Sequence, residues 1–346
     1  MKRTISALAL ATMLALGLTA CDPPMPPDVA AQIAEQTFTC IPGDSKVAFP
    51  SLMADISQGF ADSLSADCVD PLPSMSMTIV PAGTPADIEI SAYPATCTPL
   101  ATVPFATEAA DLSVYFADGY LVNLTAQTAA KILNGEITNW SDAPIAKDNP
   151  DTQLPDEPIV VRQNADKNAF NALSAWFDHL GAKISASITL TTGDQEFQPL
   201  TEGEIAILPH SVGLFNAVTP VNFIVGHDDN GQILATPDNM GIGSAATQWV
   251  PKQNGDNVTV TIDYNQAPLV MSGFDVASTP YGAIYPVNLT VCGAENLTNR
   301  ANALFLLRLD SQGSLGASSF NQLSEYVRDV ALVAVRKGLP VPTPTP

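Results

Sequence analysis

Helical and strand-like patterns alternate along the chain. Over 52–64 apolar residues recur every three or four positions after Pro50, which predicts an amphipathic helix. Thr125 is a capping residue for a helix over 125–133, and Gly135 ends it. Further helices are expected from Asp166 or Asn168 up to Gly181, over 301–309 and over 324–336.

Short apolar runs between these helices predict strands. No internal repeat is visible, and alternation of strands with helices predicts an α/β fold. The expected strands are 75–80, 87–90, 112–116, 159–161, 204–208, 221–225, 258–262 and 282–287.

The N-terminus has the pattern of a secretory leader. Lys2 and Arg3 precede an apolar stretch over 5–18, and Leu-Thr-Ala before Cys21 forms a lipobox. We therefore expect a signal peptide over 1–20 and a lipid anchor on Cys21. The alternative is an ordinary signal peptide with a chance cysteine.

Proline-rich segments flank the remaining chain. Residues 21–37 begin with a Pro-rich run, which favours an extended linker, and 341–346 form a similar tail. The apolar stretch of the leader is too short for a typical membrane span. The expected location is the cell envelope, outside the cytoplasm, with the chain held to the membrane by its N-terminal lipid.

Acidic residues dominate the charge. There are 35 Asp and Glu against 14 Lys and Arg, and the formal net charge is −21. Such a chain repels nucleic acid and anionic membrane surfaces, so no nucleic-acid partner is expected. A small anionic ligand would need a strongly local positive site.

Four cysteines remain after Cys21. An even number in an exported chain predicts two disulfides, for which three pairings are possible. We favour Cys40–Cys68 as a local link and Cys97–Cys292 as a long-range one.

No constellation of residues points to catalysis, a metal site or a cofactor. The segment 227–231 lacks the spacing of a calcium loop and is interpreted as a turn between strands. His210 is expected to be a satisfied residue more often than a functional one. Trp140, Trp176 and Trp249 are interpreted as core or hinge packing. The chain is therefore not expected to be an enzyme.

An ordered set of residues stands out within 124–177. A predicted helix is followed by a G-x-I-x-x-W turn, an I-A-x-x-N-P stretch, and then a strand with an arginine. The residues are Gly135, Ile137, Trp140, Ile145, Ala146, Asn149, Pro150 and Arg162. In these features the segment resembles the phosphate-binding protein of the high-affinity phosphate ABC transporter.

The resemblance implies a type II periplasmic-binding-protein fold, with two α/β lobes, two chain crossings and a ligand cleft between the lobes. Lobe one would span 38–112 plus 276–340, and lobe two would span 113–275. It also implies a monomer that delivers phosphate or a similar oxyanion to an ABC permease in the membrane.

The family's ligand motif is altered here. Arg162 is present, but Asn164 stands where the family has an aspartate and Asp166 where it has a serine. Ala92 stands in place of another aspartate. The ligand-binding residues carried over from the resemblance are Phe49, Ser91, Arg162, Asp166, Lys167 and Asn168.

Two interpretations of this altered motif stay open. In the first, Arg162, Lys167 and Asn168 donate to an oxyanion in the cleft. In the second, Arg162 and Asp166 pair with each other and Asp166 caps its own helix. The lost aspartates and glycines of the motif also motivate an alternative function, a binding-protein fold that serves as a surface interaction or structural lipoprotein without transport.

Overall fold

The computed structural model describes residues 29, 32, 38–193, 196–270 and 278–340. The expected leader over 1–20, Cys21 and the tail over 341–346 lie outside this part of the chain. So does the expected linker over 21–37, apart from residues 29 and 32. Within the described ranges, no helix combines the length and apolar character needed to cross a membrane.

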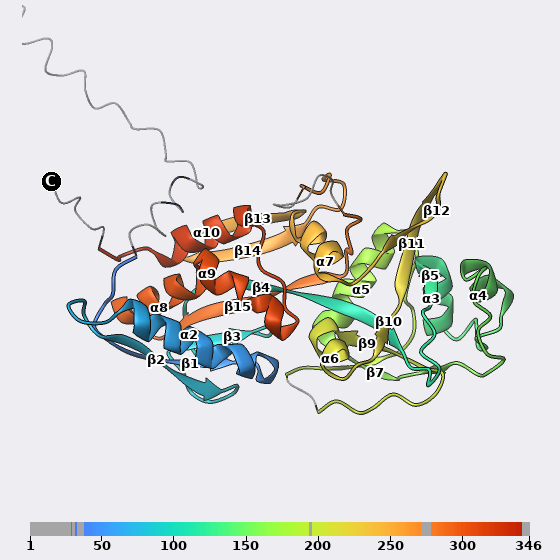
Figure 1. Ribbon diagram of the computed structural model, residues 1–346, viewed down its shortest axis with the longest axis horizontal. Coiled ribbons are helices and arrows are strands. Elements are labelled where there is room, and N and C mark those ends of the chain that lie inside the picture. The colour runs from blue at the N-terminus through green and yellow to red at the C-terminus, as the bar shows by residue number, and fades with distance from the viewer. Residues whose placement is uncertain (1–28, 30–31, 33–37, 194–195, 271–277, 341–346) are drawn as a thin grey trace, which may run out of the picture.

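The first lobe is a sheet flanked by helices (Figure 1). Its strand order is β2-β1-β3-β15-β4, so the strand that returns last in the chain lies between the third and the fourth. This is the strand order of the type II periplasmic-binding-protein fold, and the fold expected from the resemblance is confirmed. The elements are β1 (Gly43–Phe49), β2 (Met75–Pro81), β3 (Ile88–Ser91), β4 (Pro99–Val114), β15 (Ile284–Cys292), η1 (Ser51–Met53), α2 (Ala54–Asp67), α8 (Leu297–Leu307), α9 (Leu309–Gly313), η2 (Leu315–Ser318) and α10 (Glu325–Val335).

The second lobe begins on the far end of β4. Strands β9 and β10 pair with this end of β4, and a separate sheet has the order β12-β11-β5. The elements are β5 (Asn123–Thr125), α3 (Ala126–Leu133), α4 (Ala143–Asp148), β6 (Val160–Val161), β7 (Asn164–Asp166), α5 (Lys167–His179), β8 (Thr189–Thr191), β9 (Glu204–Pro209), α6 (His210–Phe215), β10 (Thr219–Pro220), β11 (Asn222–Asp228), β12 (Gly231–Ala235) and α7 (Asn239–Ala246).

The two chain crossings lie side by side. Strand β4 pairs with β15 up to Ala109 and with β9 from Ala110 onward, so the first crossing is at this point. The Tyr281 hydroxyl donates to the Ala110 carbonyl at 2.7 Å, and the Ala110 N–H donates to the Ala283 carbonyl at 2.7 Å. Trp176 packs on Tyr281 with ring centroids 4.8 Å apart. The crossings therefore form one hydrogen-bonded hinge.

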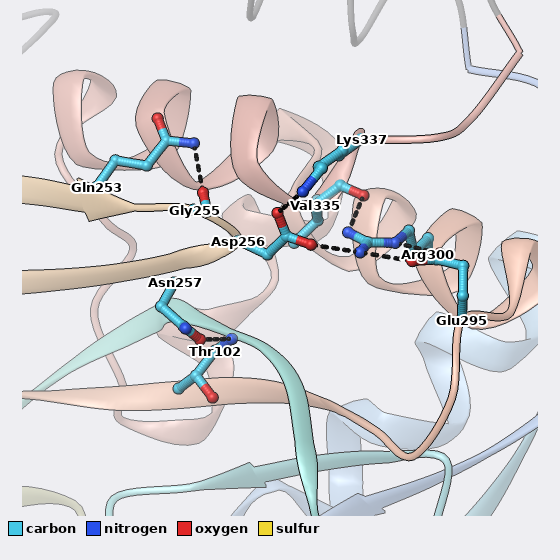
Figure 2. A network of polar contacts seen from close by, with 9 residues as sticks. All are labelled: Thr102, Gln253, Gly255, Asp256, Asn257, Glu295, Arg300, Val335 and Lys337. Carbon is cyan, nitrogen blue, oxygen red and sulfur yellow. Dashed lines mark hydrogen bonds and ion pairs between the residues drawn. The ribbon is translucent and has the colours of Figure 1, made fainter.

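A hairpin of β13 (Trp249–Asn254) and β14 (Asn257–Ile262) falls in the range expected for lobe two but joins the first sheet at β4. The Thr102 N–H donates to the Asn257 side chain at 2.9 Å. Asp256 at its tip accepts from Arg300 and Lys337 at 2.7 and 2.6 Å (Figure 2). Since Arg300 is fully buried and also bonds Glu295, this network fixes the hairpin to α8 and α10.

Local signals in the sequence predicted several helix ends. The Thr125 side chain accepts from the Thr128 N–H at the start of α3, and Gly135 and Gly181 follow α3 and α5 with left-handed backbone. Trp140, Trp176 and Trp249 are buried as expected. Of the strand expected over 112–116, residues 112–114 form the end of β4, which begins much earlier, at Pro99, and ends at Val114.

Both expected disulfides are confirmed. Cys40 pairs with Cys68, and Cys97 pairs with Cys292. The first disulfide links the segment before β1 to the residue after α2, and the second links the segment before β4 to the end of β15. Their presence fits an oxidising compartment.

Candidate functional site

A cavity of about 920 Å³ opens between the lobes. The first lobe contributes the loop after β2, which includes Gly83, and the end of β3 with Ser91. The second contributes the segment that precedes α5 and the start of α6. Small-molecule sites of binding proteins and enzymes have this size and this position between two domains, so the cavity is the candidate site.

Two polar contacts bridge the lobes at the edge of this cavity. The Tyr93 hydroxyl of lobe one donates to the Asp166 carboxylate of lobe two. The Asn168 side-chain amide donates to the Ala92 carbonyl at 2.7 Å. These bonds hold the lobes against each other, and Tyr93 was not among the residues that the sequence singled out.

Arg162 lines the cavity, and three of its N–H donors are bonded within the protein. Nε donates to Glu204 at 2.7 Å, and Nη1 and Nη2 donate to the carbonyls of Gln198 and Pro199 at 2.6 and 3.0 Å. The expected pairing of Arg162 with Asp166 is therefore wrong. Glu204, 42 residues further along the chain, lies closer because β6 and β9 are paired neighbours.

Glu204 is a well-satisfied partner. Its other carboxylate oxygen accepts from the N–H and hydroxyl of Thr201, each at 2.9 Å. Burial by itself raises the pKa of Glu204, but the hydrogen bonds from Arg162 and Thr201 outweigh it and hold the pKa below its usual value. The pair is ionised, so the Arg162 charge is neutralised within the wall of the cavity.

Asp166 caps α5, as one of the two interpretations held. Its Oδ1 accepts from the N–H groups of Asn168 and Ala169 at 2.8 and 2.9 Å. Those N–H groups are the donors that an anion at this helix end would need. Lys167 is exposed and does not line the cavity. The side chain of Asp166 thus occupies the place where an oxyanion was expected.

The two expected first-lobe residues differ in their environment. Ser91 lines the cavity, and its hydroxyl oxygen accepts from the Tyr93 N–H at 3.0 Å. Phe49 is 3% exposed and packs between Phe60 and Phe105, with centroids 5.8 and 6.4 Å away. The aromatic ring of Phe49 therefore belongs to the core of lobe one.

A buried acidic cluster lies at the hinge beside the cavity. Glu108 accepts from the Ser211 hydroxyl and from the Ala109 N–H, and burial raises its pKa to about 7. His210 bonds Asp111 at 2.9 Å behind it. Burial lowers the pKa of His210, but Asp111 and Glu108 outweigh this effect and raise it. His210 is thus a satisfied buried residue.

This cluster predicts that the protein loses stability as the pH rises. Glu108 ionises near 4.5 when unfolded and near 7 when folded, so its contribution is complete below about pH 4.5 and is lost on passing about pH 7. Between pH 5 and pH 8, we expect the free energy of unfolding of the wild type to fall by about 3 kcal/mol more than that of Glu108→Gln, as measured by urea denaturation. The exposed Glu136→Gln is the control, and parallel curves for Glu108→Gln and the wild type would contradict the assignment.

No protein-family model and no curated protein sequence matches the chain. Solved structures that it resembles include PstS from Borrelia burgdorferi, at 14% identity and a TM-score of 0.39, with 81% of this chain and 99% of that one covered. An ABC-type phosphate transport receptor from Vibrio cholerae is 12% identical at a TM-score of 0.40, covering 81% and 100%. An ancestral soluble variant of the human phosphate-binding protein is 14% identical at 0.49, covering 85% and 93%. Such distant likenesses identify no ligand for this chain.

Proposed function

We propose that the chain is a solute-binding protein outside the cytoplasm, anchored by lipid at Cys21, that closes two lobes around a small solute. Lobe one comprises 38–112 and 276–340 together with the hairpin β13–β14, and lobe two comprises the rest of 113–275. The closed lobes present the solute to an ABC permease. The observation that carries this proposal is the cavity between lobes joined by two adjacent crossings.

The hinge geometry supports closure and release. The two crossing segments are short and hydrogen-bonded to each other, so the lobes rotate about one line. The Tyr93–Asp166 and Asn168–Ala92 bonds belong to the closed arrangement, because each joins residues of different lobes. Opening has to break these two contacts at the cavity edge.

An oxyanion is the ligand that the geometry supports least. The donors expected for it are Arg162, Lys167 and Asn168. Arg162 and Asn168 are bonded within the protein, and Lys167 is exposed away from the cavity. A buried anion that no unpaired cation matches loses hydration that the site does not fully replace, which is unfavourable by several kcal/mol.

Retention of a solute tests the proposal. We expect native mass spectrometry of the chain, purified from a cell extract without denaturant, to show a bound small molecule. Ala82→Trp places an indole in the cavity from an exposed loop residue and should lower this retention at least tenfold. Ala117→Trp, exposed and outside the cavity lining, is the matched control.

The alternative is a binding-protein fold that serves as a surface interaction or structural lipoprotein. The two bridging bonds favour it, since they hold the lobes together with protein groups alone. Its expected result is a chain that carries no small molecule, with equal spectra for Ala82→Trp and Ala117→Trp. That outcome would overturn solute capture.

A further inference from the structure

We infer that the cavity binds an organic cation, an amine or quaternary ammonium group on a small apolar body. This inference rests on the proposed solute capture and assigns the chemical class of the solute. It depends on the charges around the cavity, the ion pair that Arg162 forms and the apolar side chains of the lining.

Carboxylates from both lobes face the cavity. Glu89 comes from β3, Glu108 from the crossing in β4, Asp166 from the start of α5, and Glu196 from the segment before β9. Among the described lining residues, Arg162 is the only Lys, Arg or His. A negative potential from several sides of one closed space attracts a cation and repels an anion.

The carboxylates are held in place by neutral donors. Glu89 accepts from the N–H and hydroxyl of Thr96, each at 2.7 Å. Glu108 accepts from Ser211, and Asp166 from Tyr93 and from the first N–H groups of α5. Neutral donors orient a carboxylate without cancelling its charge. Glu89 and Asp166 therefore keep their attraction for an ammonium group, whereas Glu108, whose pKa burial raises to about 7, is only partly ionised near neutral pH.

The positive charge of Arg162 does not offset this negative potential. Arg162 donates to Glu204 and to two backbone carbonyls, so it forms a neutral pair inside the wall. A carboxylate or phosphate on the solute would find no unused cation among the described lining residues. The site therefore discriminates against anionic groups by repulsion, and the charge of Arg162 is already neutralised by Glu204.

The rest of the lining suits the carbon body of such a solute. Apolar and aromatic side chains line the cavity, and Phe215 keeps 73% of its surface exposed at α6. Aromatic faces next to carboxylates are the combination that recognises ammonium groups through cation–π contact and charge. The residues are Ile90, Val212, Phe215, Tyr285, Val287 and Phe320.

Matched pairs of probes test the charge preference. Choline and phosphocholine share one quaternary ammonium, and tyramine and tyrosine share one ring and amine, while the second member of each pair adds an anionic group. Isothermal titration of the full chain should give saturable binding of at least one amine, at least tenfold tighter than its anionic counterpart. The affinity for the amine should weaken as sodium chloride is raised from 50 to 500 mM, values on the order of those that screen surface charges.

Variants locate the effect in the cavity. Glu89→Gln and Glu196→Gln should each weaken amine binding at least fivefold, whereas Glu136→Gln, outside the lining, should leave it unchanged. Glu196 is exposed, so its substitution tests the inference even if Glu89→Gln impairs folding.

Two outcomes would overturn the inference while solute capture stands. One is equal or tighter binding of phosphocholine or tyrosine. The other is an absence of saturable heat with both amines when native mass spectrometry still shows a retained solute. A chain that retains no solute at all would instead contradict the proposed function.

Discussion

Replacing both cysteines of the long-range disulfide, in Cys97→Ala/Cys292→Ala, is expected to lower the free energy of unfolding by about 5 kcal/mol. The two residues are 195 positions apart, and the loop that they close contains the whole of lobe two. In the chain-entropy account, a link that closes a long loop restricts the unfolded chain more than a short one. This is a large part of the stability of a typical protein.

The second disulfide provides the comparison. Cys40 and Cys68 are 28 positions apart, so Cys40→Ala/Cys68→Ala should cost about 3.5 kcal/mol. Urea denaturation of the two double variants and the wild type, under oxidising conditions, gives the three free energies. A larger loss for the short loop would show that local packing, rather than loop closure, sets the contribution of these links.

The long-range link also bears on the hinge. Cys97 precedes β4 and Cys292 ends β15, the two strands that carry the chain between the lobes. The disulfide lies at the lobe-one end of this strand pair and ties both strands there, whereas the hydrogen bonds between Ala110 and Tyr281 lie at the crossing itself. The strand pair is thus linked covalently at the lobe-one end and by hydrogen bonds at the crossing.

Local chemistry allowed the sequence to predict individual elements. Thr125 and Gly135 mark the ends of α3 because a hydroxyl cap and a left-handed glycine act on neighbouring backbone groups. Asp166 at the start of α5 is a cap of the same kind. The family resemblance then supplied the topology, which strand order confirms through the position of β15.

Strand β4 was largely missed for a physical reason. It is buried on both faces from Val103 onward, and its polar residues Glu108 and Asp111 interrupt the apolar run that marks a buried strand. Those carboxylates are tolerated there because Ser211 and His210 bond them. A single sequence does not reveal such partners, which lie about a hundred residues away.

The sequence pointed to a segment that lines the cavity, but not to the partners that set its charge. The segment around Arg162 and Asp166 does face the space between the lobes. The partners that decide its charge, Glu204 and Tyr93, lie 42 and 73 residues from Arg162 and Asp166, respectively, and have no local sequence signal. The residue type alone therefore did not determine whether Arg162 binds a ligand or forms a structural ion pair in the cavity wall.

Arg162→Ala is expected to lower the free energy of unfolding by about 3 kcal/mol, because it leaves the Glu204 carboxylate without its cation. The side chains of this pair are only 13% and 10% exposed. Arg308→Ala is the matched control, since its pair with Asp67 is 24% and 50% exposed and should contribute less than about 1 kcal/mol. Thermal and urea unfolding measure both losses.

A double-mutant cycle distinguishes a structural role of Arg162, as the partner of Glu204 in the cavity wall, from a role in ligand binding. If the arginine serves Glu204, the added substitution Glu204→Gln should recover part of the loss in Arg162→Ala, by about 1 to 2 kcal/mol, because no buried charge then remains unpaired. Titration with phosphate should give no saturable heat in either the wild type or Arg162→Ala. Saturable phosphate binding by the wild type that is lost in Arg162→Ala would show that the guanidinium binds the ligand. That result would contradict a purely structural role of Arg162 in the cavity wall.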